Sequence, residues 1–343
     1  MGDPPGSQPP SNPRAGRLAV ALGDPAGIGA EVTLKALAEP QLQHLEVVLV
    51  GCRRWLNASY RSLLGRCREP LRDPAELEIL DLPLREPAFP GAATAAAGDA
   101  SFHWLTAATD LVRQGECRAL VTAPIAKASW HAAGHAYPGQ TERLAELTGT
   151  AEASMLFTAR APHGQWRLNT LLATTHLPLA QVGGRLDAAR VQAKLDALLA
   201  FCQRFTPRPH LVVAGLNPHA GEAGTLGREE LEWLEPALRS WGRRHPDVHL
   251  EGPLPPDTCW LSAARAWQQP VPGPDGYLAL YHDQGLIPVK LLAFDAAVNT
   301  TLGLPFLRTS PDHGTGFTIA GQGQARAASM AAALETAWQF SRA

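Results

Sequence analysis

Short apolar runs alternate with segments of helical periodicity along most of the chain. Runs of four or more mainly apolar residues between turn-forming residues predict buried strands. These strands are expected at 18–22, 46–50, 77–80, 118–122, 166–175, 209–215, 248–251 and 277–281. Helical spacing predicts helices after 29, 127 and 141, and over 95–114, 185–205, 228–243 and 324–340. The alternation indicates an α/β fold with a mostly parallel sheet covered on both faces.

Three of the twelve histidines, His176, His219 and His282, stand just after predicted strands. In α/β sheets, ligands bind beyond the carboxyl ends of the strands. Three imidazoles with one open coordination position are typical of a catalytic divalent metal. The three residues are far apart in sequence, so three loops would have to converge. A lone histidine at a strand end is more often a cap or a surface group, and the residues alone leave both interpretations open.

Residues 281–310 also carry three polar residues at steps of nine, namely Lys290, Asn299 and Arg308. Lys290 and Arg308 have apolar neighbours, and a buried cation needs a partner. A phosphate or carboxylate would serve, since arginine can bind such a group through two hydrogen bonds. The alternative is that both are solvated surface charges.

A glycine-rich segment, 23–29, joins the first strand to the first helix. It does not match the dinucleotide-binding fingerprint, because the third glycine position is Val32. No Gly-Lys-Ser/Thr follows, so a P-loop is excluded. The segment is either a tight turn in which Asp24 caps the helix, or a loop whose backbone approaches a ligand.

Composition indicates a globular protein of one large domain or two ordinary ones, with 343 residues and 45% hydrophobic residues. A formal net charge of −2 and scattered basic residues favour neither nucleic acid nor a membrane surface. No apolar run approaches the roughly 18–20 residues that span a bilayer. Five dispersed cysteines favour a reducing, cytoplasmic setting. Residues 1–16, rich in Pro, Gly and Ser, are expected to form a disordered tail that is neither a signal nor a transit peptide.

Several short motifs occur together in one order along the chain. They are GDPAGIG (23–29), VTAPIAK (121–127), PGQTE (138–142), ATTHLPL (173–179), LNPHAGE (216–222), GPLPPDT (252–258), YHDQG (281–285), VNTTLGLPFLRTS (298–310) and DHGT (312–315). From about residue 17 onward, the chain thereby resembles the 4-hydroxythreonine-4-phosphate dehydrogenases of vitamin B6 biosynthesis.

The resemblance implies two α/β/α subdomains with a central cleft, as in the isocitrate and isopropylmalate dehydrogenases. Residues 17–140 and 299–343 would form the first subdomain, and 141–298 the second, which would carry the dimerisation surface and the metal site. It also implies a homodimer with its active site at the subunit interface. The implied activity is NAD(P)-dependent oxidation of 4-phosphohydroxy-L-threonine to 2-amino-3-oxo-4-(phosphooxy)butanoate. That product decarboxylates to 3-amino-2-oxopropyl phosphate in pyridoxal 5'-phosphate biosynthesis.

The resemblance also implies roles for individual residues. His176, His219 and His282 match the family's metal ligands, one of them contributed across the dimer interface. The metal would be zinc first, with magnesium or cobalt as alternatives. The substrate contacts match Thr141, Lys290, Asn299 and Arg308, and Gln140 is a further candidate for substrate binding.

The chain departs from the family pattern at Gln140, where a histidine is usual. Glutamine can hydrogen-bond a substrate but cannot carry a proton at neutral pH, which puts an acid/base role there in doubt. Asp257 and Asp283 are candidates for the general base or for groups that orient the metal ligands. Glu222 and Asn217 are candidates for groups that hydrogen-bond to the imidazole rings and fix their orientation.

Three functional alternatives stay open. One is a paralogous dehydrogenase of 4-phosphoerythronate or threonate 4-phosphate. A second is a metal-dependent hydrolase or aldolase that uses the same histidines without a nicotinamide, and a third is a non-catalytic phosphate-binding protein. The sequence does not decide between NAD and NADP, and it assigns no cofactor-binding residues.

Overall fold

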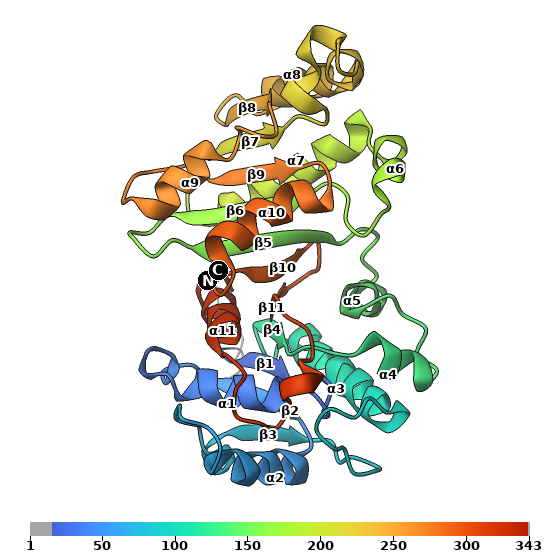
Figure 1. Cartoon of the computed structure of the whole chain (residues 1–343), viewed down its shortest axis with the longest axis vertical. Coiled ribbons are helices and arrows are strands. Elements are labelled where there is room, and N and C mark those ends of the chain that lie inside the picture. Colours follow the sequence, from blue (N-terminus) through green and yellow to red (C-terminus); the bar gives the residue numbers. More distant parts are fainter. Residues whose placement is uncertain (1–15, 342–343) are drawn as a thin grey trace, which may run out of the picture. The chain divides into compact units, whose positions relative to one another are not determined.

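The computed structural model describes residues 16–341, which form two compact units (Figure 1). Unit 1 comprises residues 16–136, Thr315–Ala325 and 337–341, and unit 2 comprises Tyr137–Gly314 and Arg326–Thr336. The division predicted from the sequence placed its boundaries at 140–141 and 298–299. It differs from these units most at the second boundary, because 299–314 were expected in the first subdomain but lie in unit 2. The expected N-terminal tail, apart from residue 16, lies outside the described residues.

Unit 1 is built on a parallel sheet of four strands in the order β3-β2-β1-β4. The strands are β1 (Leu18–Ala21), β2 (Val47–Gly51), β3 (Glu78–Asp81) and β4 (Ala119–Thr122). The helices are α1 (Gly29–Ala38), α2 (Arg53–Leu64), α3 (Ala95–Arg113) and α4 (Lys127–Ala132). Every residue of β1 and β4 is buried, as expected for parallel strands covered on both faces.

The glycine-rich segment of unit 1 is a tight turn. A Cβ on Gly29 would lie 2.2 Å from the carbonyl oxygen of Leu22, so close backbone packing requires glycine there. The Asp24 carboxylate accepts a hydrogen bond from the backbone N–H of Ala26 at 2.9 Å. Helix α1 begins after Ile28, which makes no side-chain cap. The expectation that Asp24 caps the helix is therefore wrong, since its carboxylate holds the preceding turn.

Unit 2 contains a seven-stranded mixed sheet in the order β11-β10-β5-β6-β9-β7-β8. The strands are β5 (Ser154–Arg160), β6 (Arg167–Leu172), β7 (His210–Ala214), β8 (His249–Leu254), β9 (Gly276–Ala279), β10 (Val298–Leu302) and β11 (Leu307–Pro311). Strands β6, β9, β7 and β8 pair in parallel, whereas β10 is antiparallel to β11 and β5, and β5 to β6. Strands β10 and β11 were not predicted, because they bury Thr, Ser and Arg side chains instead of an apolar run. Strand β5 was also missed, although it buries Leu156, Phe157 and Ala159.

Helices cover both faces of the unit 2 sheet, with α7 behind it and α10 in front in the view of Figure 1. The helices are α5 (Gln140–Thr148), α6 (Leu179–Val182), α7 (Ala188–Cys202), α8 (Glu235–Arg244), α9 (Leu261–Gln268), α10 (His282–Ala293) and α11 (Ala328–Phe340), the last of which belongs to unit 2 as far as Thr336. Leu286 and Val289 of α10 are buried against Leu172, Val212 and other core residues of the sheet. That packing orients the first turn of α10, which carries His282. Within residues 16–341 no helix combines the length and apolar character needed to span a membrane.

Candidate active site

Two of the three candidate histidines lie next to each other in unit 2. His176 follows β6 and His282 opens α10 directly after β9, and these two strands are parallel neighbours. Their ring centroids are 5.4 Å apart, and both rings line a cavity of about 240 Å³. The sequence argument that strand ends meet at one edge of the sheet holds for this pair.

The His282 ring is oriented by its neighbour in the sequence. Its Nδ1 lies 2.7 Å from the Asp283 carboxylate, so Nδ1 carries the proton and donates a hydrogen bond to that carboxylate. Nε2 is then the nitrogen with a free lone pair, which is the form that binds a metal.

The third histidine, His219, stands in an unusual turn after β7. Residues His219, Ala220, Glu222 and Ala223 all have φ between 42° and 53°, a region that residues other than glycine rarely adopt. Each such residue costs on the order of 1–3 kcal/mol, and such strain clusters at functional sites. The Nδ1 of His219 is 2.7 Å from the Glu222 carboxylate, so its Nε2 is also the nitrogen left for a ligand.

Carboxylates raise the pKa of His219 above its ordinary value. The hydrogen bond from the ring to Glu222 is the largest cause, followed by the charge of Glu222, with a smaller contribution from Asp257. Asp257 therefore lies within electrostatic range of the ring. The raised pKa means that a proton competes for Nε2 at a higher pH than on an ordinary histidine.

A buried glutamate that the sequence analysis did not identify organises the turn. The Glu230 carboxylate accepts hydrogen bonds from the backbone N–H groups of Leu216 and Asn217, each at 2.8 Å, and from the Asn217 side chain at 2.9 Å. Asn217 thus supports the turn rather than orienting an imidazole directly. Glu230 lies in the run Arg228–Leu234, which looks like an exposed charged helix, and only the fold reveals its burial.

The three histidines do not form one ligand set within a single chain. Among residues 16–341, no group containing all of them has its ligand atoms within 4.8 Å of one another. His176 and His282 are paired, whereas His219 lies with Glu222 and Asp257.

Arg308 is the most deeply buried cation among the candidate substrate contacts, with 3% of its surface exposed. It stands on β11 and donates to the Thr301 hydroxyl on β10 at 3.1 Å. Desolvation lowers the pKa of Arg308 to about 10, and the charge of Glu142 partly offsets this. Arg308 therefore stays charged at neutral pH.

Gln140 and Thr141 are the first two residues of α5, whose N-cap is Gly139. The helix predicted after 141 thus begins at Gln140, and Thr141 lies in its first turn. Glu142, the next residue, acts electrostatically on Arg308, so the first turn of α5 lies within range of the guanidinium. The N–H groups of a first helical turn attract anions, as does the guanidinium.

The remaining two candidates differ in their surroundings. The Asn299 side-chain oxygen, on β10, is buried and has no hydrogen-bond partner among the described residues. Lys290, on α10, lies between the two alternatives left open by the sequence, because its side chain is 40% exposed and its Nζ lies 2.8 Å from the Asp312 carboxylate. Asp312, which belongs to the DHGT motif, is a partner that the sequence analysis did not assign.

All of the candidate residues lie in unit 2. A family model described as pyridoxal phosphate biosynthetic protein PdxA matches residues 32–337. The chain belongs to the PdxA family. The resemblance inferred from the motifs is thereby confirmed.

Individual relatives extend the PdxA likeness over nearly the whole chain. A 4-hydroxythreonine-4-phosphate dehydrogenase from Synechococcus sp. (strain RCC307) is 66% identical, covering 94% of this chain and 98% of its own. A D-threonate 4-phosphate dehydrogenase from Pectobacterium atrosepticum is 40% identical, with coverage of 94% and 98%.

Solved structures share the PdxA fold seen here. The crystal structure of a 4-hydroxythreonine-4-phosphate dehydrogenase from Klebsiella pneumoniae has a TM-score of 0.79 and 39% identity, covering 95% of this chain and 99% of that one. A beta-decarboxylating dehydrogenase from Thermococcus kodakarensis, 14% identical, has a TM-score of 0.50 with coverage of 94% and 83%, which shows the fold alone. The predicted α/β fold of the isocitrate and isopropylmalate dehydrogenase type is confirmed.

Proposed function

We propose that this protein is a NAD(P)-dependent dehydrogenase that oxidises 4-phosphohydroxy-L-threonine to 2-amino-3-oxo-4-(phosphooxy)butanoate. The product is a β-keto acid, and it loses CO₂ to give 3-amino-2-oxopropyl phosphate on the route to pyridoxal 5'-phosphate. The observation that carries this proposal is 66% identity, over 94% of the chain, to a relative named for that activity.

The charges of unit 2 suit a phosphorylated acid. Arg308 offers a desolvated guanidinium, and Asn299 and Thr141 offer neutral hydrogen-bonding groups. Lys290 would exchange its ion pair with Asp312 for the substrate, and its side chain is 40% exposed whereas that of Asp312 is 16% exposed. These groups would bind the phosphate and carboxylate and hold the substrate carbon in position.

The imidazoles fit a divalent metal. His176 and His282 face one cavity, and hydrogen bonds leave Nε2 of His282 and of His219 as the ligand atoms. Nitrogen donors favour zinc or cobalt over magnesium, which prefers oxygen. A metal held by these three residues would polarise the substrate hydroxyl and lower its pKa.

The hydroxyl proton needs an acceptor, and the hydride passes to NAD or NADP. Gln140 cannot take a proton, so its role is confined to hydrogen bonding with the substrate. Asp257, near His219, and Asp283, bonded to His282, are the carboxylates we propose as the base or as groups that orient the ligands.

A second candidate function is oxidation of a related four-carbon acid, such as threonate 4-phosphate or 4-phosphoerythronate. The 40% identity to a D-threonate 4-phosphate dehydrogenase and the glutamine at position 140 favour it. The two activities differ in the substituent next to the carboxylate, an amino group in one and a hydroxyl in the other.

A substrate panel decides between these functions. Purified protein with a divalent metal is mixed with each phosphorylated acid and with NAD or NADP, and the absorbance of reduced nicotinamide is recorded. We expect the highest kcat/KM with 4-phosphohydroxy-L-threonine. A higher value with threonate 4-phosphate would establish the second function, and no reduced nicotinamide with any acid would favour a hydrolase or aldolase.

We propose that the enzyme is a homodimer and that one metal ligand comes from the partner subunit. Helix α10 presents Ile287, Leu291 and Phe294 to solvent at helical spacing, with 59%, 81% and 61% of their surfaces exposed. The same helix carries His282, and His219 of the same chain does not join the His176–His282 pair. A second copy packed on α10 would cover this stripe.

The free cysteines, four of them buried, support our assignment to the reducing cytoplasm.

Replacement of Leu291 by Glu should disrupt this dimer, because a carboxylate cannot be buried unpaired at an apolar interface. Sedimentation velocity of the wild type should show a dimer, and the variant a larger monomer fraction. Leu261→Glu, on α9, is the matched control, because Leu261 is also exposed but lies outside the α10 stripe. A monomeric wild type with full activity would contradict the proposal.

A further inference from the structure

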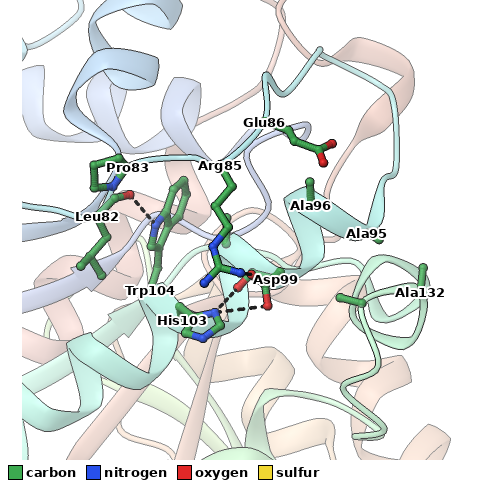
Figure 2. Close-up of a pocket in the computed structure, with 12 residues that line it drawn as sticks. Leu82, Pro83, Arg85, Glu86, Ala95, Ala96, Asp99, His103, Trp104 and Ala132 are labelled. Carbon is green, nitrogen blue, oxygen red and sulfur yellow. Dashed lines mark hydrogen bonds and ion pairs between the residues drawn. The ribbon is translucent and has the colours of Figure 1, made fainter.

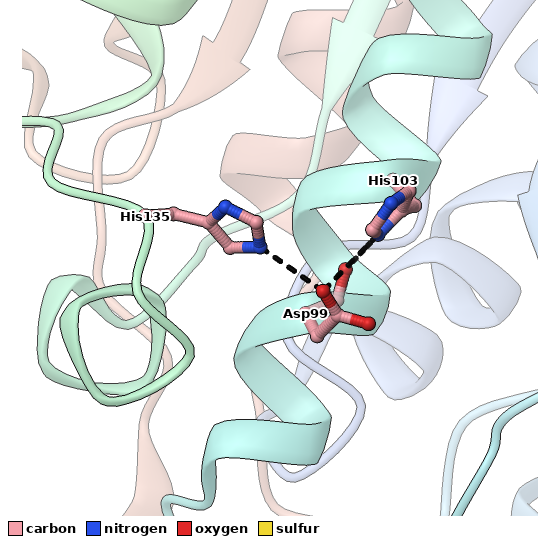
Figure 3. A group of neighbouring side chains, drawn as sticks. All are labelled: Asp99, His103 and His135. Carbon is pink, nitrogen blue, oxygen red and sulfur yellow. Dashed lines mark hydrogen bonds and ion pairs between the residues drawn. The ribbon is translucent and has the colours of Figure 1, made fainter.

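A second group of metal-binding side chains lies in unit 1, outside the site described above. Asp99 and His103 are one helical turn apart on α3, and His135 follows α4 (Figure 3). One ligand atom from each of the three lies within 4.8 Å of the others. No part of the proposed reaction uses them.

The cluster is ordered before any ion binds. The His135 ring stacks on Phe102, with ring centroids 3.7 Å apart and planes 4° apart, and its Nε2 lies 3.1 Å from the Asp99 carboxylate. Nδ1 of His103 lies 3.4 Å from the same carboxylate and 2.8 Å from the backbone carbonyl of Asp99. The carboxylate thus lies between two imidazoles, as Figure 3 shows.

One side of the cluster is open. Asp99 and His103 line a cavity of about 530 Å³ (Figure 2). The only cation directed at the carboxylate in Figure 2 is Arg85, whose nearest nitrogen is 3.7 Å from Asp99. The Arg85 side chain is 83% exposed, so this pair contributes little and can separate. The cavity leaves room for water molecules to complete a coordination shell.

We propose that Asp99, His103 and His135 form a second site for a divalent transition metal ion of the Zn²⁺, Co²⁺ or Ni²⁺ class. Two imidazole nitrogens and one carboxylate oxygen suit these ions, whereas Mg²⁺ and Ca²⁺ prefer oxygen ligands. On binding, the ion replaces the protons on the nitrogens that face Asp99, and His103 gives up its bond to the backbone carbonyl. The ion would tie the segment after α4 to α3, just before the chain passes from unit 1 to unit 2 at Ala136.

The alternative is a hydrogen-bond network that holds the same segment without a metal. Asp99→Asn distinguishes the two, because an asparagine oxygen still accepts hydrogen bonds but is a much poorer ligand for a cation. The test uses full-length protein carrying His282→Ala, to weaken the proposed catalytic metal site, after removal of metal by a chelator. Zn²⁺ binding is measured by isothermal titration calorimetry, and the Tm is measured with and without Zn²⁺.

We expect this protein to bind Zn²⁺ at the cluster and to gain Tm on binding. Adding Asp99→Asn or His135→Ala should weaken this binding by at least about tenfold and remove the gain. Asp99→Asn should leave the Tm of the metal-free protein nearly unchanged, and His163→Ala, an exposed histidine of unit 2, should change neither property. The proposal would be overturned if Asp99→Asn and His135→Ala left the Zn²⁺ affinity unchanged. It would also be overturned if the protein carrying His282→Ala alone bound no Zn²⁺.

Discussion

Replacement of His282 by Ala is expected to lower kcat/KM by about three orders of magnitude or more. The change removes one imidazole of the His176–His282 pair and weakens binding of the metal whose positive charge would stabilise the developing alkoxide. Metal polarisation of an oxygen is worth several kcal/mol, and about 4 kcal/mol corresponds to a thousandfold in rate. The measurements are kcat/KM with the phosphorylated substrate and the metal content of each chain, which should fall by one equivalent.

Matched variants separate loss of the ligand from loss of the fold. The His282 side chain is 34% exposed, so its removal should change the Tm little. Asp283→Asn keeps the His282 ligand but weakens the hydrogen bond that orients the ring, which should cost about 10- to 100-fold. His163→Ala, a change in an exposed turn, should leave kcat/KM unaltered. If His282→Ala kept its metal and its turnover, the metal role proposed for this residue would be wrong.

The sequence predicted the elements whose apolar periodicity is strong. The buried strands at 18–22 and 118–122 and the helix at 95–114 appear as β1, β4 and α3 within a residue or two. Strands β10 and β11 were not predicted, because their buried residues include Thr300, Thr309 and Arg308. Those side chains are stabilised by tertiary hydrogen bonds, such as that from the Thr309 hydroxyl to the backbone carbonyl of Ala333, which no local pattern reveals.

Some features of the candidate site could likewise be predicted from the sequence, and others could not. Position after a strand was enough to bring His176 and His282 together, because β6 and β9 are parallel neighbours. The buried Glu230 and the ion pair between Lys290 and Asp312 depend on contacts between residues distant in sequence or on the burial of a helix face. The sequence alone could not predict them, because charged residues of the same pattern are usually solvent-exposed.

Arg308→Met is expected to reduce activity severely without a matching loss of stability. Removing a buried cationic side chain that binds an anionic group of the substrate costs about 2–5 kcal/mol, which is about 30- to 5,000-fold in kcat/KM. In the free enzyme the same charge is unfavourable, because burial lowers the pKa of Arg308 to about 10. Glu142, whose charge acts on Arg308, is exposed, so its carboxylate stays hydrated in the variant.

The free energy of unfolding of Arg308→Met should therefore stay close to the wild-type value or rise, because methionine fills the space of the arginine stem without a charge to desolvate. Arg308→Lys keeps the charge but loses the bidentate geometry, so its kcat/KM should lie between those of wild type and Arg308→Met. The matched control is Arg167→Met, because burial also lowers the pKa of Arg167 to about 10 but this residue is outside the site. Steady-state kinetics and urea unfolding of the three variants test this. Equal kinetic losses in Arg308→Met and Arg167→Met would show that the effect is structural rather than substrate recognition by Arg308.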